Sequence, residues 1–398
     1  MNCAIIRYAE IGVKGKNRRT FEELLKRNIR THLKTYGIHK VELRRGRLVV
    51  WFDYDEETFL DQLCKIPGIS SVSPVHFSTH EMTDIQQQCE TSVQAMIDAN
   101  PGKTITFRVS ARRANKNFHL YSTAIERDIG GCLVQKFPQL KVDLNHFEME
   151  VGIEIWAENS VIFVSKKQGI SGMPVDPRQV VIGLISGGID SPVSSWMLMK
   201  RGCRVVFLHF HSFPYIGEQS KEKVIDLVRH LAATQPHTRL YVVPFAEIQK
   251  TIKNDCPDSL RTLLYRRFMN RIANDLALRE KGLAIITGDS LSQVASQTLD
   301  NLVCTTENAA YPVLRPLIGM DKHEIIAVAR KIGTYPLSIL DFPDCCTVFQ
   351  PQKPATRASL RSIHRAEAMI ADPDKLVKEA LDGAEMYDFY PDSIKPVS

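Results

Sequence analysis

The sequence lacks any long hydrophobic run. No stretch of about 18 apolar residues, the length that a membrane-spanning helix needs, occurs in the 398 residues. The first ten residues, MNCAIIRYAE, carry charges at Arg7 and Glu10, which interrupt the apolar core that a signal peptide requires. With 44% hydrophobic and 24% charged residues, the composition is that of an ordinary globular protein. We therefore expect a cytoplasmic protein without membrane association, long enough for two or three domains.

Cysteine motifs are lacking as well. The nine cysteines form no C-x-x-C pair and no zinc-like spacing, and they are scattered singly except for Cys345-Cys346. This pattern argues against a disulfide scaffold and against a structural metal. The pair lies in DFPDCCTVFQP, a segment that contains prolines and shows no helical or strand periodicity, which predicts a loop. A thiol in a loop is more exposed to solvent than a thiol in the core, and exposure favours its reactivity. From this pattern alone, a reactive and an inert pair are equally good interpretations.

Two common phosphate-binding motifs, G-x-x-x-x-G-K-[ST] and G-x-G-x-x-G, are absent. In their place, uncharged residues from Val180 onward run into Ser-Gly-Gly-Ile-Asp-Ser at positions 186–191. The pattern predicts a buried strand, a tight loop and a helix, with Ser191 as the N-cap and Pro192 at the first helical position. Gly187 and Gly188 are expected to take unusual dihedrals and to let the backbone approach a ligand. A helix N-terminus attracts anions, so pyrophosphate is the natural occupant.

From residue 179 onward, predicted strands alternate with predicted helices, which indicates an α/β domain with a doubly wound parallel sheet. Ligands of such sheets bind beyond the carboxyl ends of the strands. The candidate nucleotide-binding residues there are Leu184, Ile185, Ser186, Gly187, Gly188, Asp190, Ser191, His209, Phe210, Arg266, Gly288 and Gln297. We expect a helix over 291–299 to carry Gln297. Lys322 stands near a helix start, where a cation fits the helix dipole poorly unless it serves a phosphate.

Positive charge is concentrated near the N-terminus. The net charge is +6, but residues 1–50 hold 13 Lys/Arg against 4 Asp/Glu, a surplus of 9. The asymmetry suggests a polyanion partner, and we favour nucleic acid over a merely solvated face. Residues 1–77 follow the β-α-β-β-α-β order of a ferredoxin-like domain, with a strand expected over 71–77. The candidate nucleic-acid-binding residues are Lys14, Lys16, Arg18, Arg19, Arg112, Arg113 and Lys116.

Several motifs resemble known families. SGGIDS after a buried strand resembles the PP-loop of the ATP pyrophosphatase superfamily, while FRVSARRANKNFHLYS, KVDL and GISGMPV resemble the RNA-binding THUMP domain. Together with IIRYAEIGVKGKNRRTFEELL at the start and PLIGMDKHEI near the end, essentially the whole chain resembles the tRNA 4-thiouridine synthetase (ThiI) family. The resemblance implies a ferredoxin-like domain over 1–60 or 1–77, a THUMP domain over 61–166, a linker over 167–178 and a PP-loop domain over 179–398.

The resemblance also implies a reaction. That family adenylates O4 of the uridine at position 8 of tRNA with ATP, and a cysteine persulfide charged by a cysteine desulfurase supplies the sulfur. Carried over by motif, residues 186–191 bind pyrophosphate, Asp190 and Lys322 assist adenylation, and Cys346 carries the sulfur, with Cys345 as the alternative. Mg²⁺ is expected on the phosphates. Only 52 residues follow Cys346, too few for the rhodanese domain that some members append.

Alternatives stay open at this point. Another PP-loop RNA-modifying ligase needs no reactive cysteine, and a non-catalytic ATP-sensing tRNA-binding protein releases no AMP. Sulfur transfer to a carrier protein for thiamine thiazole synthesis fits the same motifs. The sequence does not identify the desulfurase or the oligomeric state, for which a homodimer is one option. It also leaves open whether a reductant or a distant thiol such as Cys256 resolves the spent persulfide.

Overall fold

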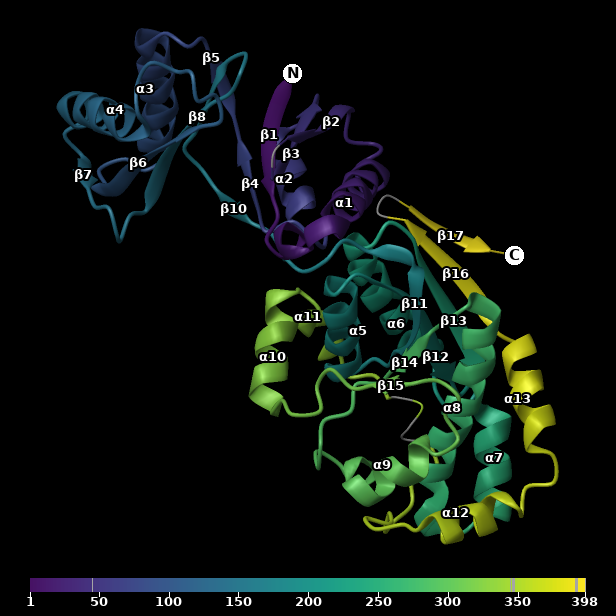
Figure 1. Cartoon of the computed structure of the whole chain (residues 1–398). Helices are drawn as coiled ribbons and strands as arrows, with labels where there is room; N and C mark the ends of the chain where they lie inside the picture. The colour runs from purple at the N-terminus through teal and green to yellow at the C-terminus, as the bar shows by residue number, and fades with distance from the viewer. Residues whose placement is uncertain (45, 344, 346–347, 391–392, 398) are drawn as a thin grey trace. The chain divides into compact units, whose positions relative to one another are not determined.

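The chain folds into two compact units, Met1–Ser171 and Gly172–Ser398 (Figure 1). The structure, a computed structural model, describes residues 1–44, 46–343, 345, 348–390 and 393–397. No helix within these described ranges is long and apolar enough to cross a membrane. Each unit has buried hydrophobic clusters of its own.

The first unit begins with an antiparallel sheet of order β10-β4-β1-β3-β2. Its elements are β1 (Asn2–Arg7), η1 (Glu10–Val13), η2 (Gly15–Asn17), α1 (Arg18–His32), β2 (Ile38–Arg44), β3 (Arg47–Phe52), α2 (Glu56–Cys64), β4 (Ser71–Pro74) and β10 (Lys167–Gln168). Leu24, Leu25 and Ile29 recur at helical spacing and form the buried stripe of α1. The order β1-α1-β2-β3-α2-β4 confirms the predicted ferredoxin-like domain.

A second sheet of order β5-β9-β8-β6-β7 completes the first unit. Its elements are β5 (His76–Ser78), α3 (Met82–Asp98), β6 (Ile105–Arg113), α4 (Ser122–Lys136), β7 (Leu140–Val142), β8 (Met149–Ile155) and β9 (Ser160–Phe163). The strand expected over 71–77 is split, because β4 pairs with β1 whereas β5 leaves that sheet and pairs with β9. The two sheets share a buried cluster that contains Ile5 and Val49 from one sheet and Val161 and Phe163 from the other.

The second unit is built on a seven-stranded sheet of order β15-β14-β11-β12-β13-β16-β17. Its strands are β11 (Asp176–Leu184), β12 (Cys203–His211), β13 (Thr238–Pro244), β14 (Ala284–Ile286), β15 (Val313–Leu314), β16 (Glu385–Tyr390) and β17 (Ser393–Val397). Its helices are α5 (Asp190–Lys200), α6 (Glu218–Leu231), η3 (Ala232–Thr234), α7 (Ala246–Asp255), η4 (Asp258–Leu260), α8 (Arg261–Glu280), η5 (Ala295–Gln297), α9 (Leu299–Thr306), α10 (Lys322–Lys331), α11 (Tyr335–Ser338), α12 (Leu360–Glu367) and α13 (Pro373–Asp382).

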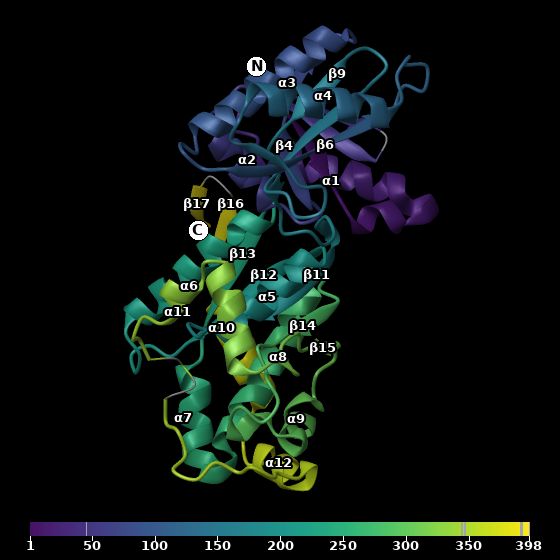
Figure 2. The same cartoon turned by 90° about the vertical axis from the view of Figure 1, so that its left-hand side faces the viewer.

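This sheet is doubly wound, as predicted, although it is not wholly parallel. The five strands from β15 to β13 are parallel, but β16 and β17 extend the sheet as an antiparallel hairpin. Val180 and Ile182 of β11 pack with α8 on one face, while Gly183 lies against Ser195 of α5 on the other. Helices α5 and α6 therefore cover one face (Figure 2), and α7, α8 and α13 pack together on the other (Figure 1).

Three local expectations differ from the structure. Helix α5 starts at Asp190, so Ser191 is not its N-cap; the Ser191 hydroxyl instead folds back onto Ser186. The helix expected over 291–299 is wrong, because Ser292 has a left-handed φ of 62° and the chain forms only η5 before Thr298 caps α9. The segment 167–178, expected as a linker, contains β10 and the start of β11.

Candidate active site

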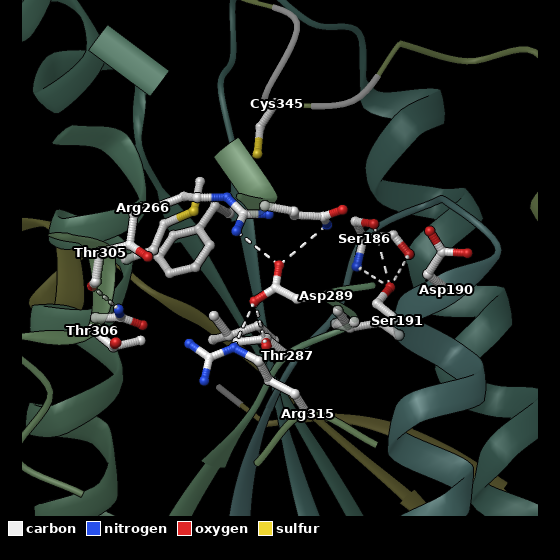
Figure 3. A pocket seen from close by; sticks show the side chains of 17 residues that line it. Ser186, Asp190, Ser191, Arg266, Thr287, Asp289, Thr305, Thr306, Arg315 and Cys345 are labelled. Atoms are coloured by element: carbon white, nitrogen blue, oxygen red, sulfur yellow. Dashed lines mark hydrogen bonds and ion pairs between the residues drawn. The ribbon is translucent and has the colours of Figure 1, made fainter. Parts of the chain in front are cut away.

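A cavity of about 200 Å³ lies at the carboxyl edge of the second unit's sheet (Figure 3). Its wall comes from the ends of β11, β12 and β14, the start of α5, helix α8, helix α9, and loops of the C-terminal half. It consists of Leu184, Ile185, Ser186, Asp190, Ser191, Phe210, Arg266, Met269, Asn270, Thr287, Gly288, Asp289, Gln297, Thr305, Thr306, Arg315 and Cys345. Most of the predicted nucleotide-binding residues are thus brought together, as expected for a ligand site at strand ends.

The loop between β11 and α5 is closed by its own serines. The Ser186 amide donates to the Ser191 hydroxyl at 2.9 Å, and the Gly188 amide faces the Ser186 hydroxyl at 3.3 Å. A Cβ at Gly288 would lie 2.9 Å from the Ser191 nitrogen, which is too close for two non-bonded atoms. Only glycine therefore allows the chain after β14 to lie this close to the N-terminus of α5. The positive end of the α5 dipole consequently faces the cavity.

Gly187 and Gly188 are close to this cavity but are not part of its wall. Neither has a positive φ, so the expectation of unusual dihedrals is wrong. A Cβ at Gly187 would lie 3.2 Å from the Lys223 side chain, so a larger residue there would require this lysine to shift. His209 is buried, with 2% of its surface exposed, and it does not line the cavity. Its Nδ1 lies 3.0 Å from the Ile185 carbonyl oxygen. Phe210, its neighbour, does line the cavity.

Asp190 and Lys322 form an ion pair beside the loop. Lys322 Nζ lies 2.7 Å from Asp190 Oδ1, and Gln293 Nε2 donates to Asp190 Oδ2 at 2.9 Å. Lys322 begins α10, where Asp321 and Glu324 make a capping box. These two acidic side chains stabilise the helix start, which removes the conflict between the lysine and the helix dipole. The Lys322 ammonium group is thereby fixed next to the N-terminus of α5.

Asp289, next to the predicted site residue Gly288, is the centre of a buried polar network. Its side chain is 4% exposed and accepts from Arg266 at 2.7 Å and from Arg315 at 3.3 Å. Thr287 and Gln297 donate to it at 2.7 and 3.2 Å. Burial alone would raise the pKa of Asp289, but the Arg266 guanidinium, with these donors and Arg315, holds it below its usual value. The ionised carboxylate therefore fixes two arginines in the cavity wall.

The two arginines of YRRFM have different environments. Arg266 faces the cavity, whereas the neighbouring Arg267 is 2% exposed and pairs with Glu367 at 2.7 Å and with Glu307 at 3.0 Å. Only Arg266 is therefore placed to meet a ligand. Arg315 is a site residue that the sequence analysis did not select; its signal is its position directly after β15, at the same carboxyl edge.

The cysteine pair is partly described. Cys345 is 5% exposed, and its sulfur points toward the cavity from the side opposite Arg315 (Figure 3). Cys346, the predicted sulfur carrier, lies outside the described residues. Cys256, the distant thiol considered as a resolver, is buried, and burial raises its pKa to about 11. A thiol that stays protonated is a poor nucleophile, so the structure speaks against that role.

The predicted RNA-binding residues lie in the first unit, where the structure forms two basic cavities. One, of about 580 Å³, is lined by Arg18, Arg19, Arg44 and Arg112 together with Glu22, Leu43 and Gly46. The second, of about 360 Å³, includes Arg7, Arg47, Arg108, Arg112 and Lys166 beside Glu150 and Glu154. Lys16 and Lys116 are exposed, Lys14 is half-buried over the Phe21 ring, and Arg113 stacks on Tyr121. A phosphate backbone suits such surfaces.

The fold and site define the class of this protein. A parallel sheet with an SGGIDS loop at its carboxyl edge is an ATP-pyrophosphatase-type domain, here joined to ferredoxin-like and THUMP domains. Family models match each part: the ThiI ferredoxin-like domain over residues 3–73, the THUMP domain over residues 79–165, and the thiamine biosynthesis protein ThiI over residues 178–371. The chain is therefore an enzyme of the PP-loop class with an appended THUMP module.

Whole-chain comparisons identify the family. The chain is 41% identical to a probable tRNA sulfurtransferase of Moorella thermoacetica, with 98% of each chain covered. It is 39% identical to one of Lachnoclostridium phytofermentans, covering 96% of this chain and 98% of that one. A crystal structure of a 4-thiouridine synthetase–RNA complex with bound ATP matches with a TM-score of 0.89 at 34% identity, covering 98% of this chain and 100% of that one. The chain belongs to the ThiI family of tRNA sulfurtransferases, which confirms the predicted fold and family.

Proposed function

We propose that this protein converts the uridine at position 8 of tRNA to 4-thiouridine in two steps, an adenylation by ATP and a sulfur transfer from a cysteine persulfide. The observation that carries the proposal is that Ser186, Asp190 and Ser191 of the SGGIDS loop line the same cavity as Cys345. A ligase without a reactive thiol has no need for a cysteine there. The ATP and the RNA in the complex of the similar synthetase support the choice of substrates.

In the first step, O4 of the uridine attacks the α-phosphorus of ATP and pyrophosphate leaves. The amides at the start of α5 would receive the departing pyrophosphate, since a helix N-terminus favours negative charge. The Lys322 ammonium, held by Asp190, would neutralise charge that develops on the phosphates. Arg266 and Arg315, fixed by Asp289, would contact the nucleotide from the opposite wall.

In the second step, the terminal sulfur of the persulfide attacks C4 of the activated base and AMP leaves. The new sulfur then bridges the base and the cysteine until another thiol or a reductant breaks the S–S bond, which leaves the sulfur on the uridine. We assign the persulfide to Cys346 by its place in the family motif, with Cys345 as the alternative. Cys345, the neighbour of Cys346 in the chain, lines the cavity wall, which supports a sulfur transfer from this segment to a base in the cavity.

Mg²⁺ fits the cavity as a companion of ATP. Within the described residues, no group of three or more His, Cys, Asp and Glu side chains converges on one point, so an all-protein metal cage has no support there. Magnesium is commonly bound by phosphates and one or two carboxylates. Asp190 would hold it, because its side chain is 20% exposed at the cavity wall, whereas that of Asp289 is 4% exposed and accepts from two arginines. When bound, the ion would neutralise charge on the phosphates.

The remaining assignments follow from this reaction. The tRNA would bind through Lys14, Lys16, Arg18, Arg19, Arg112, Arg113 and Lys116, with the ferredoxin-like domain over 1–60 or 1–77, the THUMP domain over 61–166 and the PP-loop domain over 179–398. A cysteine desulfurase would charge the persulfide in the cytoplasm, where tRNA is found. Sulfur transfer to a carrier protein for thiamine thiazole synthesis, and a homodimer, belong to the same proposal.

The decisive assay incubates the protein with ATP, unmodified tRNA and a desulfurase with cysteine, and then digests the tRNA for mass spectrometry. We expect AMP, pyrophosphate and one 4-thiouridine at position 8. AMP without thiolated base would favour another PP-loop RNA-modifying ligase. Binding of both ATP and tRNA without AMP would favour a non-catalytic sensor.

A further inference from the structure

The segment that leads to the cysteine pair is held through its backbone carbonyls by side chains of neighbouring helices. Lys223 of α6 donates to the carbonyls of Ser338 and Leu340 at 3.0 and 2.7 Å. Ser220, also of α6, donates to the Pro343 carbonyl at 2.8 Å. The described part of this segment is therefore attached to α6 at three carbonyls before it reaches Cys345.

Gln249 continues this attachment at the cysteine itself. It lies on α7, is 0% exposed, and its Nε2 donates to the Cys345 carbonyl oxygen at 2.9 Å. Its Oε1 accepts from the Ser212 hydroxyl at 2.5 Å, and Ser212 is also 0% exposed. Ser212 directly follows β12, so a chain of two buried hydrogen bonds connects the carboxyl edge of the sheet with the backbone of Cys345. The Ser212 bond also fixes which end of the Gln249 amide faces the cysteine.

We propose that Gln249 is a positioning residue for sulfur transfer, which holds the backbone of Cys345 beside the nucleotide cavity without contacting the nucleotide. This rests on the proposed function, in which a sulfur of this pair must reach C4 of the activated base. Gln249 is absent from the wall of the cavity, whereas Cys345 is part of it. The groups assigned to adenylation are the amides at the start of α5, Lys322, Arg266 and Arg315, and not Cys345. Loss of Gln249 should therefore slow the sulfur step and spare the first step.

Substitution of Gln249 is compatible with folding. The Cys345 carbonyl also accepts from the Val348 amide at 3.2 Å, so Gln249→Met, which has a similar shape, leaves this carbonyl with a partner. A lost buried hydrogen bond commonly corresponds to about a tenfold change in an equilibrium or rate. We therefore expect single-turnover thiolation by Gln249→Met to fall at least about tenfold, with AMP formation within about twofold of the wild type.

Gln235 supplies a matched control. It is also 0% exposed, and its amide bonds to the Val205 backbone at 3.0 and 2.8 Å and to Thr238 at 2.8 Å, between β12 and β13. Gln235→Met should lower stability while leaving the ratio of thiolation to AMP formation unchanged. Ser212→Ala is the second test variant, because it frees the Gln249 amide to rotate and should lower the same ratio to a smaller extent.

A readout independent of catalysis separates this proposal from the proposed function. The rate at which iodoacetamide alkylates Cys345, measured by peptide mass spectrometry, should rise at least about tenfold in full-length Gln249→Met and stay unchanged in Gln235→Met. If the wild type makes no 4-thiouridine, the proposed function fails whatever the alkylation result. If Gln249→Met and Ser212→Ala keep wild-type alkylation and a wild-type ratio of thiolation to AMP, Gln249 is not a positioning residue.

Discussion

Replacing Asp289 by asparagine tests whether the buried carboxylate organises the ATP cavity. The substitution keeps the size of the side chain but removes the charge that faces Arg266 and Arg315. Each hydrogen bond to a charged group contributes about 1.5–3 kcal/mol, and the asparagine oxygen can still accept one of the two. We therefore expect the free energy of unfolding to fall by about 2–4 kcal/mol, which lowers Tm by about 10 °C for a domain of this size.

The same substitution should weaken adenylation more than its effect on stability explains. One guanidinium group would lose its fixed position and the other its charged partner, so kcat/KM for AMP formation should fall about 10- to 100-fold. Asp388 is the matched control, because it is 6% exposed and pairs with Arg239 at 2.9 Å outside the cavity. Asp388→Asn should lower Tm similarly and leave kcat/KM for ATP within about threefold, after correction for the folded fraction.

The pH dependence of this effect has a definite sign. The pKa of Asp289 is held below its usual value, so its stabilising contribution is present above the unfolded-state pKa of about 4 and is lost as the pH falls through the folded-state pKa. The Tm difference between wild type and Asp289→Asn should be constant from about pH 7 to 5 and narrow below about pH 4. An Asp289→Asn variant with wild-type kcat/KM for ATP would refute the organising role, even if Tm falls.

Three further predictions concern the other parts of the site. Asp190→Ala should reduce AMP formation at least about 100-fold, because Lys322 loses the partner that holds it, while the affinity for tRNA should change less than about twofold. Loss of both AMP formation and tRNA affinity would contradict the division of labour between the units. Binding of tRNA should weaken steeply as the salt concentration rises, and Arg112→Ala should reduce the slope of log K against log salt by about 0.9. An unchanged slope would mean that the Arg112 side chain contacts no phosphate. In single-turnover assays Cys346→Ser should release AMP but transfer no sulfur; normal thiolation by Cys346→Ser with none by Cys345→Ser would reverse the assignment.

The parts of the site that could be predicted are those encoded locally. A buried strand, two glycines and a helix start lie within residues 180–196, so short-range patterns suffice for the loop and for its place at a strand end. The order of strands and helices likewise predicted the ferredoxin-like domain and the doubly wound sheet. The contact of Gly187 with Lys223 could not be predicted in this way, because it depends on a helix that begins about 30 residues later in the chain.

The parts that could not be predicted depend on long-range contacts. Asp289, Arg266 and Arg315 come from three separate elements, and only the folded sheet shows that they converge on one point. Gln249 looks like any polar residue of an amphipathic helix until Cys345 is placed beside it. The β16–β17 hairpin pairs with a strand about 150 residues earlier, and its sequence carries no signal for that partner.

In the proposed reaction, one cavity couples ATP cleavage to sulfur transfer on tRNA. This coupling can be tested by the ratio of AMP to 4-thiouridine formed in a single turnover with α-labelled ATP, unmodified tRNA and persulfide-loaded protein. We predict one AMP for each 4-thiouridine and no AMP above background without tRNA. Thiolated tRNA formed without an equal amount of AMP, or AMP released equally well without tRNA, would contradict this coupling.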